Sequence, residues 1–342
     1  MIFLYLLLAL LIIIPLPKIK TNNIYDDYLN QDSTLYIKGI FVIMVLFGHF
    51  SDYIVYEGIL DRLYELIVLL FGQFIVTMFF FYSGYGIFES VKRKGKQYIQ
   101  SFPKKRMLFV WLSFAVCVTF FLIGGGLLGN TFSSKQIVLS YLAWDNLGNS
   151  NWFMFVTFAT YILFYISFIK YNESKTLNNL IIFTILVFLL MIFLYFTQTN
   201  CWWDTIICFP LGMWFSYYKN TIDEHMKYNK NWIISIILLI IMLAITSYLG
   251  VFVYHPIYVI ASICFSLIVV LLTMKIKINN SILKFLGNHV FSIYMLQRLV
   301  FMLMSLVLSN KYLLFFASLI IIIFISSIFD SIMNKFRNYC LK

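Results

Sequence analysis

The chain has 342 residues, of which 62% are hydrophobic and 11% are charged. An ordinary soluble domain is roughly 45–50% apolar and about 25% charged, so this composition excludes a soluble globular enzyme and indicates an integral membrane protein. The net charge of +11 does not indicate a nucleic-acid-binding protein, because the basic residues lie between apolar runs instead of on one solvated face.

The apolar runs predict about eleven transmembrane helices joined by short loops. They are expected near residues 1–17, 36–51, 63–89, 107–129, 152–170, 177–196, 204–218, 232–250, 256–274, 288–309 and 312–333. The first run lacks preceding basic residues and a small-residue cleavage site, so we expect a retained span instead of a signal peptide. The predicted fold is an all-α polytopic bundle, with residues 1–20 as an extra N-terminal helix and residues 33–335 as one membrane domain.

Basic residues predict the orientation of this bundle. The run KRKGKQYIQSFPKKR at 92–106 is expected to form a loop that the positive-inside rule places in the cytoplasm. By alternation, the other inner basic residues are Lys18, Lys20, Lys170, Lys175, Lys219, Lys227, Lys230, Lys275, Lys277, Lys284, Lys335, Arg337 and Lys342. The N-terminus is then outside and the C-terminus inside. The longest outer loop, residues 130–151, is expected to contain a short interfacial helix.

The motifs of metal and covalent serine chemistry are missing from the sequence. The five cysteines are thinly spread and show no disulfide framework or metal-ligand spacing. There is no His-Glu-x-x-His, no Gly-Lys-Ser/Thr loop and no Gly-x-Ser-x-Gly. We therefore expect no metal in the site.

Two ionisable residues share one face of the predicted helix at 36–51. Lys38 and His49 are eleven positions apart, which brings them within roughly 20° of the same face at a rise of about 16 Å. A cation near the inner surface suits the phosphates of a soluble donor, and a histidine deeper in the groove can move a proton near neutral pH. The alternative is that Lys38 is a positive-inside anchor and His49 an interfacial histidine bonded to a backbone carbonyl.

Four segments, in this order, resemble the acyltransferase-3 family of bacterial membrane enzymes that modify surface glycans. They are residues 36–52, with a basic residue, ten residues and a histidine; FFFYSGYGIF at 79–88; NWFMFVTFATY at 151–161; and LGNHVFSIYMLQ at 286–297. The resemblance implies that residues 33–335 form the family's ten-helix core. It also implies a multi-pass protein of the bacterial plasma membrane.

The sequence departs from that family pattern at two positions. Lys38 stands where the family has an arginine, which keeps the charge but loses the bidentate fork. Gln297 stands where the family has a late histidine, and Arg298 follows it. We expect position 297 to orient substrate.

The resemblance implies that acyl-CoA, expected to be acetyl-CoA, binds at the inner face. His49 would then act either as general base on an acceptor hydroxyl or as a transient acyl carrier. Asp52 either orients the imidazole or is an exposed outer carboxylate. Donor-binding candidates are Lys38, Ser83, Gly84, Lys92 and Arg93, although small-residue helix packing also explains the Ser-Gly pair and membrane anchoring also explains the basic pair.

The expected acceptor-binding residues lie near the outer face. They are Asp52, Glu65, Asn151, Trp152, Tyr294, Gln297 and Arg298. Asn151 and Trp152 combine an amide with an aromatic ring, as in sugar platforms and also in membrane-belt anchors. Arg298 lies well inside an apolar helix, so it is expected to face protein or a water-filled cavity.

These residues together predict an O-acetyltransferase that modifies an exported or lipid-linked polysaccharide, with a capsule-type glycan as the first candidate. The expected partners are the lipid bilayer, acyl-CoA and the glycan. A polysaccharide or lipid exporter shares the polytopic architecture and is the alternative. A lipid or small-molecule acyltransferase of the same fold is a second alternative, because fold does not fix the acceptor.

Overall fold

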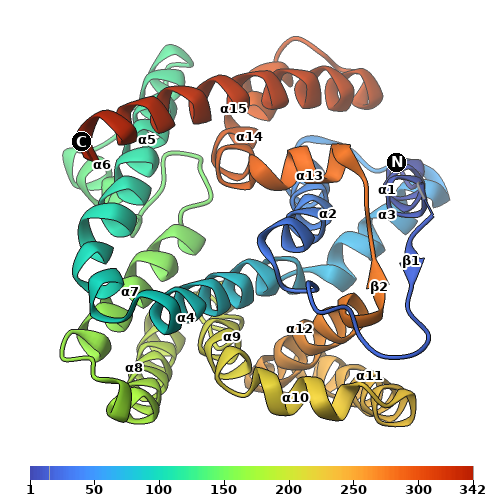
Figure 1. Cartoon of the computed structure of the whole chain (residues 1–342). Coiled ribbons are helices and arrows are strands. Elements are labelled where there is room, and N and C mark those ends of the chain that lie inside the picture. The colour runs from blue at the N-terminus through green and yellow to red at the C-terminus, as the bar shows by residue number, and fades with distance from the viewer. Residues whose placement is uncertain (15, 342) are drawn as a thin grey trace.

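The computed structural model describes residues 1–14 and 16–341, most of which are helical (Figure 1). The α-helices of the first half are α1 (Phe3–Ile13), α2 (Gln31–Phe50), α3 (Gly58–Phe71), α4 (Phe74–Phe102), α5 (Phe109–Leu127), α6 (Ser134–Tyr141) and α7 (Trp152–Phe168). Those of the second half are α8 (Thr176–Thr197), α9 (Cys208–Tyr217), α10 (Lys219–Met226), α11 (Asn229–Phe252), α12 (Tyr258–Lys275), α13 (Ser281–Asn288), α14 (Val290–Met304) and α15 (Lys311–Leu341).

Short elements connect these helices. They are the 3₁₀ turns η1 (Ser51–Tyr53), η3 (Glu173–Lys175), η4 (Asn200–Trp202) and η5 (His255–Ile257), the π-helical turn η2 (Pro103–Leu108), and the strands β1 (Lys18–Ile19) and β2 (Ile276–Lys277). The two strands pair antiparallel, with Lys18 opposite Lys277. This pairing joins the segment after α1 to the end of α12.

The expected all-α membrane bundle is confirmed. Among the described residues, six segments are long and apolar enough to cross a membrane: Gln31–Tyr53, Gly58–Leu127, Glu173–Thr197, Asn229–Phe252, His255–Lys275 and Lys311–Cys340. The helices α1, α7 and α14 are apolar but shorter. The chain is therefore a multi-pass membrane protein.

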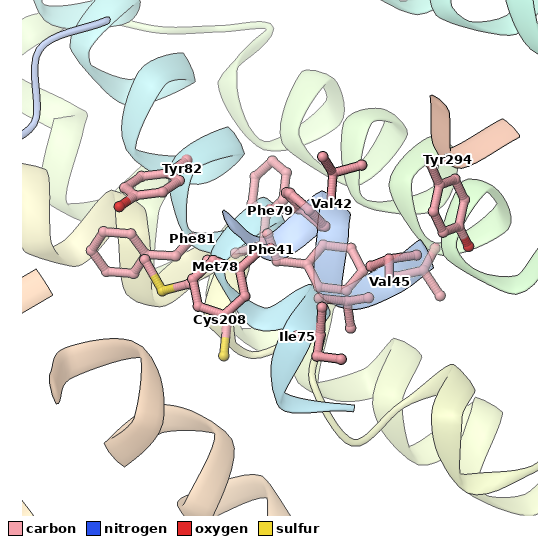
Figure 2. Packing of buried hydrophobic residues seen from close by; sticks show 14 of the residues in the cluster. Phe41, Val42, Val45, Ile75, Met78, Phe79, Phe81, Tyr82, Cys208 and Tyr294 are labelled. Atoms are coloured by element: carbon pink, nitrogen blue, oxygen red, sulfur yellow. The ribbon is translucent and has the colours of Figure 1, made fainter. Parts of the chain in front are cut away.

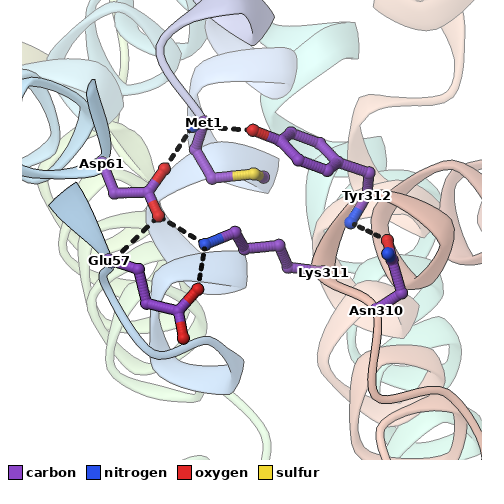
Figure 3. A network of polar contacts seen from close by, with 6 residues as sticks. All are labelled: Met1, Glu57, Asp61, Asn310, Lys311 and Tyr312. Atoms are coloured by element: carbon purple, nitrogen blue, oxygen red, sulfur yellow. Dashed lines mark hydrogen bonds and ion pairs between the residues drawn. The ribbon is translucent and has the colours of Figure 1, made fainter.

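Ion pairs between distant segments lie at both ends of the bundle. At one end, which we call the basic end, Lys284 of α13 pairs with Asp32 at the start of α2 at 2.9 Å. At the other, which we call the opposite end, Lys311 of α15 pairs with Asp61 of α3 at 2.6 Å and with Glu57 at 3.2 Å (Figure 3). These contacts join segments that are distant in the sequence, so each end is held by long-range ion pairs.

The predicted helix at 63–89 is wrong, because the structure divides this region into α3 and α4. The break falls at Gly72, whose φ is +34°, a conformation that favours glycine. Both sides of the break are apolar, so hydropathy gave no sign of it. Both ends of α3 lie at the opposite end of the bundle, where Asp61 meets Lys311 and Gly72 lies near Tyr258 at the start of α12.

The basic run at 92–106 is helical and not the loop that the sequence predicted. It continues α4 and passes into η2, with a change of direction at Gly95, where φ is +52°. Lysine, arginine and glutamine are good helix formers, so a charged run beyond the membrane edge can remain helical. The result is that η2 approaches the bundle with Lys105 and Arg106.

Other predicted boundaries also shift. The run expected at 288–309 forms α14, which begins at Val290, and the separate helix α13 precedes it; α2 begins at Gln31, before the expected start at 36. The helix expected at 1–17 is α1, Phe3–Ile13, and Pro15 and Lys342 lie outside the described residues. The short helix expected in the loop at 130–151 is present as α6.

The core is centred on α4, which crosses the middle of the view in Figure 1. Figure 2 shows its side chains Ile75, Met78 and Phe79 in one cluster with Phe41, Val42 and Val45 of α2. On another face α4 meets α9 closely: a Cβ at Gly84 would lie 1.9 Å from the Phe209 carbonyl oxygen, and one at Gly212 would lie 2.1 Å from that of Phe81. Glycines on both helices therefore allow backbone contact, as is common between membrane helices.

Candidate active site

A cavity of about 610 Å³ lies between α2, α4, α5, α7, η2 and the C-terminal helices. Its lining includes Gln31, Asn334 and Arg337, which are exposed at the basic end of the bundle. Gln31 and Lys38 both line it from α2, and seven residues of helix place Lys38 about 10 Å deeper than Gln31. The size and the opening suit a small organic ligand that enters from the basic end.

Four cationic side chains line the cavity: Lys38 of α2, Lys105 and Arg106 of η2, and Arg337 of α15. In the part of the chain that the structure describes, none of the four forms an ion pair with a carboxylate. Their recorded contacts are with aromatic residues instead. Arg106 donates from Nε to the Tyr161 hydroxyl at 3.2 Å, and the Lys38 ammonium lies 5.6 Å from the centre of the Tyr82 ring. Cations held without carboxylate partners are arranged for an anionic ligand such as a phosphate.

Asp330 of α15 also lines the cavity, but other groups engage its carboxylate. Its Oδ2 lies 2.5 Å from His289 Nδ1 and accepts a hydrogen bond from Ser292 Oγ at 2.8 Å. The carboxylate is thereby held against the start of α14. The cations of the cavity remain available to a ligand.

Aromatic side chains line the part of the cavity farthest from its opening. Phe79 of α4, Phe153 of α7 and Tyr294 of α14 all contribute to the lining. The ring centres of Phe79 and Phe153 are 6.3 Å apart, and those of Phe153 and Tyr294 are 5.3 Å apart. The cavity therefore carries cations from its mouth to Lys38, about 10 Å deeper than Gln31, and ends in aromatic rings.

His49 lies just beyond that inner end. Its ring centre is 5.9 Å from that of Tyr294, and its Nε2 lies 3.3 Å from the Ser150 hydroxyl oxygen. Its other nitrogen, Nδ1, is buried and has no hydrogen-bond partner in the described protein. The sequence predicted one passage shared by Lys38 and His49, but His49 is not among the residues that line the cavity. Tyr294, which does line it, packs against the His49 ring.

A polar cluster surrounds His49 on the side of the opposite end. Arg298, one turn after Tyr294 on α14, pairs with Asp52 at 3.0 Å and donates from Nε to the Gly148 carbonyl at 3.2 Å. Tyr53 donates to the Arg298 carbonyl at 3.2 Å. The arginine thus joins the end of α2 to the segment before α7, and it faces protein, as expected for an arginine in an apolar helix.

The predicted donor residues are only partly brought together. Lys38 and Ser83 line the cavity. Gly84 faces the backbone of α9, Lys92 pairs with Glu89 and donates to the Ser216 carbonyl, and Arg93 is exposed. The last three lie outside the cavity lining, so the geometry favours helix packing and surface contacts for them.

Only some of the predicted acceptor residues lie near His49. Tyr294 packs on its ring, Arg298 pairs with Asp52 just after the helix that carries His49, and Trp152 packs edge-on against Phe153, which lines the cavity. Glu65 instead lies on α3, and among the described residues no hydrogen bond or ion pair joins its side chain to His49, Asp52 or Arg298.

Two further predicted acceptor-binding residues donate hydrogen bonds to nearby backbone carbonyls. Asn151 donates to the carbonyls of Ala143 and Asp145 and so shapes the loop before α7. Gln297 is buried, and its Nε2 donates to the Tyr294 carbonyl at 3.2 Å.

Sequence reasoning missed four residues of this region: Lys105, Arg106, Arg337 and Ser150. The three cations were assigned to membrane anchoring, since the positive-inside rule explains a basic residue equally well wherever its side chain points. No sequence motif indicated a role for Ser150. Its position before Asn151 and Trp152 is informative only once the loop is known to fold over His49.

The fold and the cavity define a membrane-embedded protein whose polar site, with a histidine beside it, is built inside the helix bundle. Residues 31–330 match a family model described as an acyltransferase domain, so the chain belongs to the acyltransferase-3 family. The resemblance of the four sequence segments is therefore confirmed. No curated protein and no solved structure matches the chain.

Proposed function

We propose that the protein is an O-acyltransferase that moves an acetyl group from cytoplasmic acetyl-CoA to a hydroxyl of an extracytoplasmic or lipid-linked polysaccharide. The observation that carries this proposal is the cavity whose four cations have no carboxylate partner within residues 1–14 and 16–341, and whose lining residue Tyr294 packs on His49. CoA combines phosphates with a long uncharged arm, and the cavity runs from cationic to aromatic in the same order.

The orientation follows from the charges. The basic end carries the cavity mouth and the helical basic run, so by the positive-inside rule it faces the cytoplasm. The N-terminus is then outside and the C-terminus inside, in a bacterial plasma membrane. The donor enters through the mouth near Arg337, and the acceptor approaches His49 from the opposite end.

The transfer itself needs a base near the thioester. His49 Nδ1 has no partner among the residues that the structure describes, so this nitrogen is available to take the proton of an acceptor hydroxyl. The hydroxyl oxygen then bonds to the acyl carbon, the carbon–sulfur bond breaks, and the CoA sulfur leaves and takes up a proton. Transfer through an acyl-histidine uses the same nitrogen as nucleophile and takes two displacements. The nitrogen first bonds to the acyl carbon as the carbon–sulfur bond breaks and the CoA thiol leaves; the acceptor oxygen then bonds to that carbon as the carbon–nitrogen bond breaks, and the hydroxyl proton returns to the imidazole.

The test measures donor binding and transfer separately. CoA should raise the melting temperature of the purified, detergent-solubilised protein, because a ligand that binds the folded state stabilises it. His49→Ala should keep that response and lower acetylation of the surface glycan at least about 100-fold, the contribution of a positioned acid–base group. Mass analysis of glycan from cells with the wild-type or the variant protein at equal expression gives the second measurement.

Two outcomes would contradict the proposal. Acetylation that persists in His49→Ala removes the assigned role of the histidine. A protein that shows no response to CoA, in cells whose glycan is exported but not acetylated, favours the exporter. Mass analysis of lipids from the same cells separates a lipid acyltransferase from a glycan acyltransferase.

A further inference from the structure

Aromatic rings separate the cationic cavity from His49. Phe153 contacts Phe79 and Phe80 of α4 on one side and Tyr294 of α14 on the other, with ring centres 6.3, 4.7 and 5.3 Å away. Tyr294 in turn packs on the His49 ring. The rings of Phe153 and Tyr294, which we call the aromatic barrier, both line the cavity, and Tyr294 connects this lining to the imidazole.

The same separation is visible along α2. Helical periodicity places Lys38, Val42, Val45 and His49 on one face. Lys38 lines the cavity, whereas Val42 is 0% exposed and Val45 is 5% exposed in the hydrophobic core. The face between the cation and the histidine is therefore apolar and packed, with no water route along it.

Tyr294 is tied to a segment that faces the opposite end. Its hydroxyl donates to the Ser150 carbonyl at 3.3 Å, and the Ser150 hydroxyl lies 3.3 Å from His49 Nε2. The same segment accepts the hydrogen bond of Arg298 at Gly148. The position of the Tyr294 ring thus depends on residues 148–150, which lie on the side from which an acceptor approaches.

We propose that the aromatic barrier makes this enzyme select a hydroxyl acceptor over water. This inference rests on the proposed function. With Tyr294 held by Ser150, the thioester in the cavity cannot reach His49. An acceptor that contacts residues 148–150 releases the tyrosine ring and joins the two compartments. In its absence the bound donor is protected from hydrolysis, since a closed site excludes side reactions with water.

Loss of the barrier has a defined chemical consequence. The oxygen of a water molecule bonds to the acyl carbon, the carbon–sulfur bond breaks, and acetate and the CoA thiol are released. His49 takes the proton of the water as it would take that of a hydroxyl. Free thiol that appears from acetyl-CoA without any acceptor therefore reports an open barrier.

The experiment uses the purified full chain with acetyl-CoA alone and follows free thiol. Phe153→Ala removes one ring and should raise the rate of thiol release about tenfold or more. Tyr294→Phe keeps the ring but loses the hydrogen bond to Ser150, and should raise it about fivefold, the equilibrium equivalent of one neutral hydrogen bond. Adding His49→Ala to Phe153→Ala should return the rate to that of the wild type.

Tyr64→Phe is the matched control. Tyr64 is also a buried tyrosine that donates to a backbone carbonyl, that of Phe47 at 2.7 Å, but it lies on α3, away from the cavity. The control should release thiol at the wild-type rate. If Phe153→Ala does not fold, the isosteric Tyr294→Phe decides the question.

The outcomes distinguish a failure of the aromatic barrier from a failure of the proposed acyltransferase function. The barrier is refuted if the variants respond to CoA like the wild type yet release thiol no faster than Tyr64→Phe. If the wild type is neither stabilised by CoA nor able to acetylate glycan, the proposed function itself fails. Faster release in both variants, with normal stabilisation by CoA, supports the barrier.

Discussion

The cations of the cavity and the cations at the opposite end of the bundle differ in whether a carboxylate pairs with them. In the cavity, Lys38, Arg106 and Arg337 have aromatic neighbours and no carboxylate partner among the described residues. At the opposite end, Arg298 is paired with Asp52, and Lys311 with Asp61. Paired charges at the edge of an apolar bundle hold helices together, whereas unpaired cations in a cavity are arranged for a ligand. The comparison predicts that removal of a paired cation lowers stability, whereas removal of an unpaired cavity cation lowers affinity for the ligand.

The largest effect on stability is expected from a paired cation. Lys311→Met removes one of the two cations that contact the carboxylate of Asp61, which is 3% exposed; the terminal ammonium of Met1 remains on its other oxygen (Figure 3). The cost should be about 2–3 kcal/mol, below the full cost of breaking a buried pair because part of the lysine is exposed. The melting temperature should fall by several degrees, while donor affinity is unchanged.

Lys311→Arg is the control, because it keeps the positive charge facing Asp61 and Glu57. It should recover most of the lost melting temperature. A Lys311→Met variant as stable as the wild type would show that this network does not hold α3 to α15 (Figure 3).

The sequence predicted what depends on local periodicity. Lys38 and His49 belong to one helix, so their shared face could be read from their spacing alone, and α2 does carry both toward the site. The cavity could not be predicted in this way. It needs η2 and the end of α15 to meet, and these segments are far apart in the sequence.

The break between α3 and α4 and the position of Arg106 were not predicted for a related reason. Hydropathy does not separate α3 from α4, since only Gly72 and Gln73 interrupt the apolar residues, and the backbone conformation at Gly72 marks the turn. Equally, the positive-inside rule gives Arg93 and Arg106 the same score, although only Arg106 turns into the bundle.

That last pair provides the second prediction. Arg106→Ala removes an unpaired cation from the cavity and should raise KM for acetyl-CoA about tenfold, the loss of one charge-assisted hydrogen bond to a phosphate. The melting temperature without ligand should fall less than in Lys311→Met, because Arg106 loses its hydrogen bond to the Tyr161 hydroxyl but no carboxylate loses a partner. Steady-state kinetics and thermal melts of the same preparation measure both.

Arg93→Ala is the matched control, since Arg93 is an exposed arginine from the same basic run. It should leave KM unchanged. The reverse result, with KM raised by Arg93→Ala but not by Arg106→Ala, would place the donor phosphates on the surface of α4, as the sequence predicted, and not in the cavity.

The smallest expected effect on melting temperature concerns a carboxylate at the opposite end, of which only one oxygen has a partner among the described residues. Asp204, between η4 and α9, is 1% exposed; its Oδ2 lies 3.2 Å from His255 Nε2, but its Oδ1 has no partner in the described protein. Burial raises the pKa of Asp204 to about 6, and the hydrogen bond from His255 only partly offsets this.

Because the folded protein then holds this proton more tightly than the unfolded chain, whose aspartates titrate near pH 4, stability should decline as pH rises from about 4 through 6 and level off above that. Asp204→Asn lacks the titrating group and should lack this part of the pH dependence. Melting temperatures across the range should therefore show a wild-type advantage at low pH that shrinks by a few degrees toward neutral pH. Parallel curves for the two proteins would mean that Asp204 is ionised throughout, with its charge fully met by His255, and that the opposite end is as completely paired at this carboxylate as it is at Asp61.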